Sequence, residues 1–338
     1  MKGRTMNSSP PLIPVKPAPL QYDLPNFAAA IEAGSTVRIV ALGSSTMSGE
    51  GGIAAFPYRL EAVLRDKYDN RRIDVVNRGV GGEEAPKELE RLKRDVIDEK
   101  PSLLIWQMGT NSVWQKPEDH PPSHEQTITA LREGIRRVRE KGSIDIILMD
   151  PQCVPAMLTE ATRAATDKMV SAIAEVSRQE RVNLFRRFEL MKGWHHVEKI
   201  SFDRMVDPGD KDRLHDSDWA TQKLTSVLSD LIVARVPKPV PVKAFVIAAE
   251  TVKDEATFSE YRKAVPATLE AFGGKFTVRG GHLDSLEGKW PHPRLVIIEF
   301  PSREAAEGWY KSPAYQEIIG LRQRSSVGDL VIVEGQVD

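Results

Sequence analysis

The feature that most constrains the fold of this chain is an alternation of apolar runs and amphipathic stretches between residues 36 and 236. The apolar runs are typical of buried strands, and the stretches between them have the apolar spacing of helices. Strands that alternate with helices pair in parallel through right-handed crossovers. We therefore predict a three-layer α/β/α domain around one parallel sheet, with ligands at the carboxyl ends of its strands.

The predicted elements of this domain follow one another closely along the chain. Strands are predicted over residues 37–43, 72–77, 102–109, 144–150 and 182–187. Helices are predicted over residues 56–69, 86–99, 124–142, 155–180 and 217–236, and Ser217 is a candidate N-cap of the last one. Residues 1–35 contain many prolines and little periodicity, which predicts an extended N-terminal arm on the surface.

A run of alternating prolines, Val236-Pro237-Lys238-Pro239-Val240-Pro241, interrupts the pattern. Such a run cannot continue a helix and favours an extended spacer, so we predict a linker over residues 237–242. The second domain, residues 243–338, has strands predicted over 243–252, 275–281, 294–300 and 329–335, and helices over 254–273 and 302–325. This βαββαβ order is that of the ferredoxin-like α+β fold.

The composition of the chain limits its partners. The 338 residues carry a net charge of −1, which gives no indication of a nucleic-acid partner. No apolar run approaches the roughly 20 residues of a membrane span. The first residues lack the pattern of a signal peptide, so we expect a cytoplasmic protein, while a longer precursor or another export route is left open. The single cysteine, Cys153, excludes an intramolecular disulfide and is expected to be a small buried residue.

Four short motifs carry candidate chemistry. They are Gly43-Ser44-Ser45-Thr46, Asn77-Arg78-Gly79-Val80-Gly81-Gly82, Gly109-Thr110-Asn111 and Asp212-Arg213-Leu214-His215. Together they supply a nucleophile, backbone and side-chain oxyanion donors, and a base with an orienting carboxylate, which are the parts that acyl transfer needs. The first three motifs each follow a predicted strand, so they are expected to meet in one cleft.

In this order the motifs resemble those of the SGNH, or GDSL-type, hydrolases, over residues 36–236. The resemblance implies a serine esterase without a metal or organic cofactor. It implies Ser45 as nucleophile, His215 as general base and Asp212 as the orienting acid, with Ser45, Gly82 and Asn111 forming the oxyanion hole. Gly81 is the near alternative to Gly82. The alternatives to Asp212 are nearby aspartates: Asp207, Asp210, Asp216 and Asp218.

The sequence departs from the pattern of that family at three positions beside the motifs. Ser44 stands where the family usually has Asp, Thr46 where it has Leu, and Ser112 where an Asp commonly follows the asparagine. These changes leave turnover and the optimum pH open. Ser44 and Trp114 are candidates for lining the substrate cleft.

The expected substrate is a small ester with a short acyl group, including O-acetyl groups on carbohydrates, and thioesters come next. Two alternatives remain at this point. In the first, the hydrolase fold is a catalytically dormant scaffold for ligand binding or assembly. In the second, the main activity belongs to the C-terminal domain.

The second domain resembles a family of unknown function in the dimeric α/β-barrel superfamily over residues 243–335. The resemblance rests on Ala244-Phe245-Val246-Ile247-Ala248 and on Trp309 with the following Tyr310-Lys311-Ser312-Pro313-Ala314-Tyr315. It implies a homodimer in which two sheets pack face to face. Candidate residues for a small-ligand pocket are Arg279, His282 and Glu299.

Overall fold

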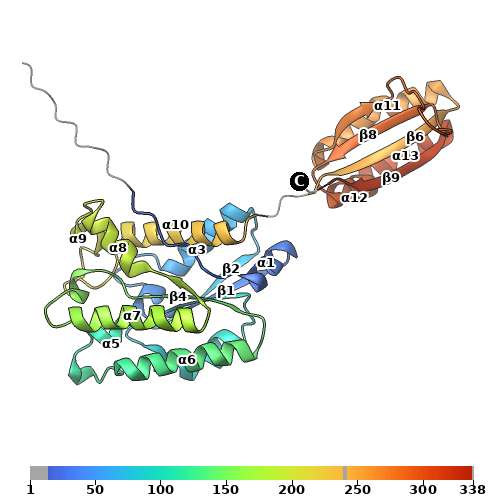
Figure 1. The fold of residues 1–338 in the computed structure, drawn as a ribbon. Helices are drawn as coiled ribbons and strands as arrows, with labels where there is room; N and C mark the ends of the chain where they lie inside the picture. The colour runs from blue at the N-terminus through green and yellow to red at the C-terminus, as the bar shows by residue number, and fades with distance from the viewer. Residues whose placement is uncertain (1–13, 239–241, 337–338) are drawn as a thin grey trace, which may run out of the picture. The chain divides into compact units, whose positions relative to one another are not determined.

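The structure, a computed structural model, describes residues 14–238 and 242–336. The chain folds into two compact units, Met1–Pro239 and Val240–Asp338 (Figure 1). Part of the predicted linker, residues 239–241, and part of the predicted arm, residues 1–13, lie outside the described residues. The two units are described separately below.

The first unit contains a five-stranded parallel sheet. Its strands are β1 (Val37–Gly43), β2 (Ile73–Gly79), β3 (Leu103–Gln107), β4 (Asp145–Met149) and β5 (Asn183–Phe185). They lie in the order β2-β1-β3-β4-β5, and every neighbouring pair is parallel. The order reverses between β1 and β3, which is where ligands of this flavodoxin-like arrangement bind. The predicted fold class is confirmed.

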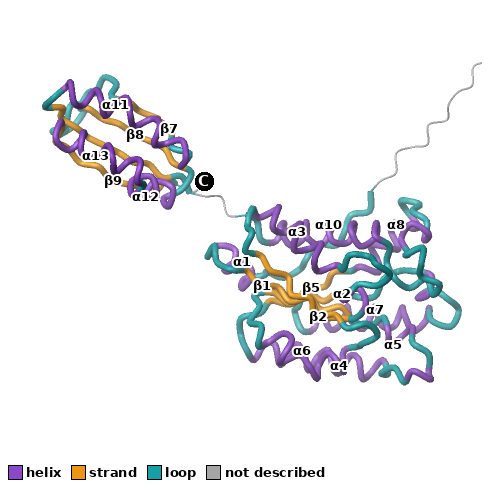
Figure 2. The backbone as a smooth tube through the Cα atoms, turned by 180° about the vertical axis from the view of Figure 1, so that it is seen from behind, coloured by secondary structure: helices purple, strands orange, loops and turns teal. Residues whose placement is uncertain are grey.

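Helices cover both faces of this sheet (Figure 2). The helices of the unit are α1 (Pro25–Glu32), α2 (Ser45–Ser48), α3 (Phe56–Tyr68), α4 (Ala85–Leu92), α5 (Asn111–Trp114), α6 (His124–Glu140), α7 (Arg163–Gln179), α8 (Arg187–His196), α9 (Phe202–Met205) and α10 (Asp218–Arg235). One core packs α1, α3, α8 and α10 against the sheet, and the other packs α4, α6 and α7. Successive β1 residues, Ile39 and Val40, enter opposite cores, so the strand is apolar on both faces from Ile39 to Leu42.

Three elements differ from the sequence-based expectation. The predicted extended arm contains α1, whose Phe27 and Ile31 are buried in the core. The Asp145 carboxylate accepts a hydrogen bond from the Phe27 N–H at 2.9 Å, which fixes this helix against β4. The helix predicted over 155–180 begins only at Arg163, after a short 3₁₀ turn. Helix α8 was not predicted. The Ser217 cap of α10 is confirmed, because its side chain accepts from the Ala220 N–H.

The second unit has the βαββαβ order that the sequence predicts. It consists of β6 (Ala244–Val252), α11 (Glu255–Leu269), β7 (Lys275–Arg279), β8 (Arg294–Phe300), α12 (Arg303–Lys311), α13 (Pro313–Ser325) and β9 (Ser326–Glu334). The four strands form an antiparallel sheet in the order β7-β8-β6-β9. The predicted helix over 302–325 is divided at Ser312, because a residue before proline avoids helical dihedral angles and Pro313 then begins a new helix.

The two faces of this second sheet differ in exposure. Val246, Val296 and Ile298 pack into the core beside α11. Since side chains alternate along a strand, the residues between them point to the opposite face. On that face Val331 and Val333 of β9 are exposed, and they pair with Ile247 and Phe245 of β6. An apolar sheet face is therefore left uncovered within this unit.

Candidate active site

Ser45 lies at the carboxyl end of β1, where it is the first residue of α2. As a first helical residue it has no intrahelical acceptor for its N–H, and this group makes no hydrogen bond to the described part of the chain. The preceding Ser44 is buried, and both its N–H and its hydroxyl donate to Gln107 Oε1 at 3.0 Å. The prediction that Ser44 lines the cleft is wrong. Ser44 instead ties the turn that carries Ser45 to the end of β3.

The glycine-rich loop after β2 packs against α2. The Val80 N–H donates to the Gly43 carbonyl at 2.9 Å, and the Asn77 amide donates to the Met47 carbonyl at 2.6 Å. A Cβ atom at Gly79 would lie 2.2 Å from the Ser48 nitrogen, so only glycine permits this approach. Gly82 has a φ of 78°, which also favours glycine. This packing places the loop beside the helix that Ser45 begins.

Asn111 begins α5 at the carboxyl end of β3 and is buried. The Glu84 carboxylate accepts hydrogen bonds from the N–H of Gly109 at 3.0 Å and of Asn111 at 2.8 Å. The Asn111 amide donates to the Glu83 carbonyl at 3.0 Å, next to Gly82. Burial raises the pKa of Glu84, and the N–H groups of Gly109 and Asn111 partly offset this effect. Glu84 thus anchors the asparagine turn, a role that the sequence did not reveal.

His215 is paired with Asp210 and not with the predicted Asp212. The distance from His215 Nδ1 to Asp210 Oδ2 is 2.9 Å, and the same oxygen accepts the N–H groups of His215 and Leu214. Burial alone raises the pKa of Asp210, but these N–H groups and the charge of His215 outweigh it and lower the pKa. Asp212 is exposed, and its own N–H donates to Asp210. The backbone turns around the Asp210 carboxylate, and Arg213 in this turn has a φ of 56°. The carboxylate five residues before His215 therefore reaches the His215 ring.

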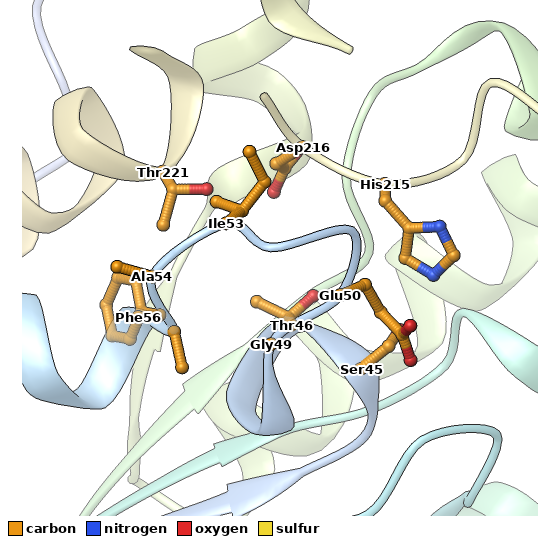
Figure 3. A pocket seen from close by; sticks show the side chains of 11 residues that line it. Ser45, Thr46, Gly49, Glu50, Ile53, Ala54, Phe56, His215, Asp216 and Thr221 are labelled. Atoms are coloured by element: carbon orange, nitrogen blue, oxygen red, sulfur yellow. The ribbon is translucent and has the colours of Figure 1, made fainter. Parts of the chain in front are cut away.

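Ser45 and His215 line one pocket (Figure 3). Figure 3 shows them at one end with Glu50, and Phe56 and Thr221 at the other. Within the described residues the serine hydroxyl and the histidine ring are not hydrogen-bonded to each other, as is common before substrate binds.

The remaining predicted site residues do not line this pocket. Gly82 lines another pocket together with Gln115, whose amide donates to the Gly82 carbonyl at 2.9 Å. Asn111 is linked to Gly82 through the Glu83 carbonyl. Trp114 is half-buried against the core, so the prediction that it lines the cleft is not supported by the pocket's geometry.

A buried arginine connects the turn that carries Ser45 to the turn that carries His215. Arg187, at the start of α8, has a fully buried side chain. Its guanidinium donates to Thr46 Oγ1 at 3.1 Å and to Gln152 Oε1 at 2.8 Å, and it lies 3.5 Å from the Asp216 carboxylate. Gln152 in turn donates to the Leu214 carbonyl at 3.0 Å. Residues on both sides of Ser45 and His215 are therefore held by one polar network.

The same network contains two carboxyl groups that are costly to ionise. Burial raises the pKa of Asp150 to about 7, and Arg187 partly offsets this rise. Burial also raises the pKa of Asp216, with Arg187 and His215 acting against it. One oxygen of Asp216, Oδ1, is buried without a hydrogen-bond partner among the described residues, and Asp216 lines the pocket. The positive charge of Arg187 lowers the free-energy cost of ionising these two buried carboxyl groups.

Replacing Arg187 by methionine is expected to lower the free energy of unfolding by about 3–5 kcal/mol, because it leaves buried carboxylates without their cation. Urea denaturation measures this change. Arg186→Met is the matched control, since Arg186 is adjacent and exposed, and its effect should stay within about 0.5 kcal/mol. Equal effects of the two substitutions would contradict this assignment.

Cys153 is buried, as the sequence predicted, and burial raises the pKa of its thiol to about 12. The thiolate is the reactive form, so the native protein is expected to react with Ellman's reagent only as fast as it opens. The measurement is the absorbance change with and without denaturant. Stoichiometric reaction of the native protein within seconds would be inconsistent with this position of Cys153.

The side chains that the sequence analysis missed differ in how clearly the local sequence pattern marks them. Gln107 is the one polar side chain in an otherwise apolar run, and that break in pattern is a usable signal. Asp210 was among several equivalent aspartates, and only the turn geometry selects it. Arg187 is preceded by another arginine, so no local pattern distinguishes the buried one from the exposed one.

In the described ranges, no group of three or more His, Cys, Asp and Glu side chains is placed to hold a metal ion. No helix within residues 14–238 or 242–336 combines the length and apolarity needed to cross a membrane.

Comparisons with solved structures find the fold of the first unit elsewhere. A lipase/acylhydrolase from Enterococcus faecalis is 20% identical, covers 60% of this chain and 98% of its own, and gives a TM-score of 0.50. An acetylxylan esterase from Geobacillus stearothermophilus is 20% identical, covers 60% of this chain and 95% of its own, and gives a TM-score of 0.48. No curated protein sequence matches the chain significantly.

Two family models match the sequence, one in each unit. Residues 243–336 match a family described as a domain of unknown function (DUF1330). Residues 13–238, most of the chain, match the model of the non-GDSL lipase-like family. By that match the chain belongs to the non-GDSL lipase-like family.

Proposed function

We propose that the protein is a serine esterase that hydrolyses small carboxylic esters through an acyl-enzyme. The observation that carries the proposal is that Ser45 and His215 line one pocket, while Asp210 contacts Nδ1 of that histidine. A carboxylate at Nδ1 leaves Nε2 of the neutral imidazole as the proton acceptor. The two residues are distant in sequence, and they line a pocket at the carboxyl end of β1, where sheets of this kind bind ligands.

In the proposed mechanism, Ser45 Oγ attacks the ester carbonyl carbon while His215 Nε2 takes the hydroxyl proton. The tetrahedral oxyanion accepts hydrogen bonds from the N–H groups of Ser45 and Gly82 and from the Asn111 amide. When it collapses, the alcohol leaves with the proton from His215 and the acyl group stays on Ser45. Water then attacks the acyl-enzyme, with His215 as base, and releases the acid.

Free donors beside Ser45 support this oxyanion hole. In the described part of the chain, the N–H groups of Ser45, Gly81 and Gly82 make no hydrogen bond. One N–H of the Asn111 amide donates to the Glu83 carbonyl, which orients the side chain and leaves its second N–H for a substrate. Gly81 remains the alternative to Gly82, because both N–H groups belong to the same loop.

The walls of the pocket favour a short acyl group. Ile53, Ala54 and Phe56 line it, and Phe56 is almost fully buried at the end away from Ser45 (Figure 3). A long chain would therefore meet packed core side chains. We expect acetyl esters, including O-acetyl groups on carbohydrates, to be preferred over longer acyl esters, with thioesters as the next class.

The test is hydrolysis of p-nitrophenyl acetate, butyrate and octanoate, together with labelling by a fluorophosphonate, which reacts only with an activated serine. The expected result is faster turnover of the acetate than of the octanoate, with the label located on Ser45 by peptide mass spectrometry. An unlabelled, inactive protein would favour the dormant scaffold, and a label elsewhere would overturn the site.

The uncovered sheet face of the C-terminal domain supports a homodimer. Val331 and Val333 are exposed on it, and pairing a second copy would remove them from water. The double substitution of Val331 and Val333 by lysine is expected to convert a dimer into a 37.7 kDa monomer in light scattering. Leu286→Lys is the control, because Leu286 is 93% exposed outside the strands. A monomeric wild type would exclude this interface.

A further inference from the structure

A second pocket lies inside the C-terminal domain, between the sheet and α11. Its apolar lining includes Val246 of β6, Phe258 of α11, Phe276 of β7, Val296 of β8 and Trp309 of α12. The pocket is open to solvent and the enclosed part of it is small, so only a small molecule fits, with part of it toward the opening. We call this space the C-terminal slot. It lies in the unit that takes no part in the proposed esterase mechanism.

Three arginines line the C-terminal slot: Arg262, Arg279 and Arg294. The Arg279 guanidinium lies 4.4 Å from the ring centre of Phe276, and that of Arg294 lies 5.6 Å from the ring centre of Phe258. These distances allow cation–π attraction, which holds both guanidinium groups against the apolar walls.

A glycine permits the position of Arg294. A Cβ atom at Gly280 would lie 2.0 Å from Arg294 Nη1, so any side chain at that position would displace the guanidinium. Of the residues that the sequence suggested for a pocket here, Arg279 lines the slot. His282 instead pairs with Asp284 at the surface, and Glu299 pairs with Lys243.

The C-terminal slot has more positive than negative charge. Its one buried carboxylate, Glu250, is shared between Arg294 at 3.7 Å and Arg322 at 4.0 Å. The Nε atoms of both arginines are buried and have no hydrogen-bond partner among the described residues. Buried polar groups are nearly always paired, so each of these Nε atoms lacks an acceptor.

Arg279 adds to the excess of positive charge. Its guanidinium donates to the Arg262 carbonyl at 3.0 Å, and no carboxylate in the described ranges lies within 4.0 Å of it. Arg262 itself is paired with Glu255 at 2.9 Å. An anion entering the slot would therefore meet Arg279 and Arg294 without displacing a carboxylate from Arg279.

We propose that the C-terminal slot binds a small organic acid with a flat or unbranched apolar body. The body lies against Phe258, Phe276 and Val296, and the carboxylate accepts hydrogen bonds from Arg279 and Arg294. The planar fork of a guanidinium matches a carboxylate, and such charge-assisted hydrogen bonds are strong where water is limited. Ester hydrolysis also releases acids of this class, but the proposal does not depend on that activity.

The experiment is isothermal titration of the full chain with sodium benzoate, with benzamide as the uncharged ligand of the same shape. We expect benzoate to bind at one site per chain and benzamide to bind at least about 10-fold more weakly, since a hydrogen bond to a charged group contributes roughly 1.5–3 kcal/mol. Arg279→Gln, on the exposed rim, should weaken benzoate by a similar factor. Arg303→Gln, an exposed arginine of the same domain, should not.

Two further variants separate this site from the esterase site and from misfolding. Binding should persist in Ser45→Ala, because the slot lies in the other unit. Arg294→Gln should also lose binding, and circular dichroism checks that it remains folded. Equal binding of benzamide, unchanged binding in Arg279→Gln, loss of binding in Ser45→Ala, or no binding of benzoate at millimolar concentration would each overturn the proposal.

Discussion

Replacing Ser45 by alanine is expected to lower the turnover of p-nitrophenyl acetate by about 10⁴-fold or more and to abolish fluorophosphonate labelling. The reason is that no acyl-enzyme can form without Oγ, while the oxyanion donors and the pocket remain. The residual rate then reflects those donors alone. The measurement is steady-state kinetics on the purified variant, with labelling of the same sample.

Ser48→Ala is the matched control for this prediction. Ser48 ends the same short helix, so the variant loses a hydroxyl from the same element without losing the proposed nucleophile. Its turnover should stay close to that of the wild type. If Ser48→Ala loses activity as Ser45→Ala does, or if Ser45→Ala keeps it, the nucleophile has been assigned to the wrong serine.

Replacing Asp210 by asparagine is expected to lower kcat by about 10³–10⁴-fold at neutral pH. The asparagine oxygen can still accept the N–H groups of Leu214 and His215, so the turn is kept. The carboxylate that orients the His215 ring and stabilises its protonated form is lost. Since the pKa of Asp210 is lowered in the fold, its ionised form favours the native state above the ordinary carboxyl range, and this contribution is lost as the pH falls through the lowered pKa.

Asp212→Asn distinguishes the two candidate acids. Asp212 is exposed, and its side chain does not contact His215. We therefore expect kcat within a few-fold of the wild type in this variant. A large loss in Asp212→Asn together with a small loss in Asp210→Asn would restore the acid that the sequence suggested, and would mean that the turn rearranges when substrate binds.

Much of the fold could be predicted because its signal is local. Runs that are apolar at nearly every position, such as the one that forms β3, bury both faces, which is how a parallel sheet between two helical layers appears in sequence. The boundaries were less predictable where one residue decides them. Pro313 divides a helix that has continuous apolar spacing, and Pro25 begins one inside a segment that looked extended.

Some residues of the candidate site can be predicted from local sequence, and others depend on tertiary contacts. Ser45, Gly82, Asn111 and His215 stand at strand ends or before the last helix, so their order alone predicted one cleft. The acid, Asp210, depends on a turn with Arg213 at positive φ. Spacing along the chain does not determine which carboxylate such a turn brings to an imidazole. The Arg187 network joins residues from α2, the loop after β4, α8 and the turn that carries His215, and no local pattern encodes such a contact.

The sequence by itself determined the alternation of strands and helices and the division into two units, because periodicity and proline placement depend on neighbouring residues. Its short motifs also led to the proposal of Ser45 as nucleophile. Only the tertiary structure decided which aspartate meets His215, that Ser44 is buried on Gln107, and that Arg279 and Arg294 share one slot. Those contacts join residues through packing of whole elements. The energies of these contacts depend on burial and on charges from other elements of the fold. The local sequence determines neither the burial nor those charges.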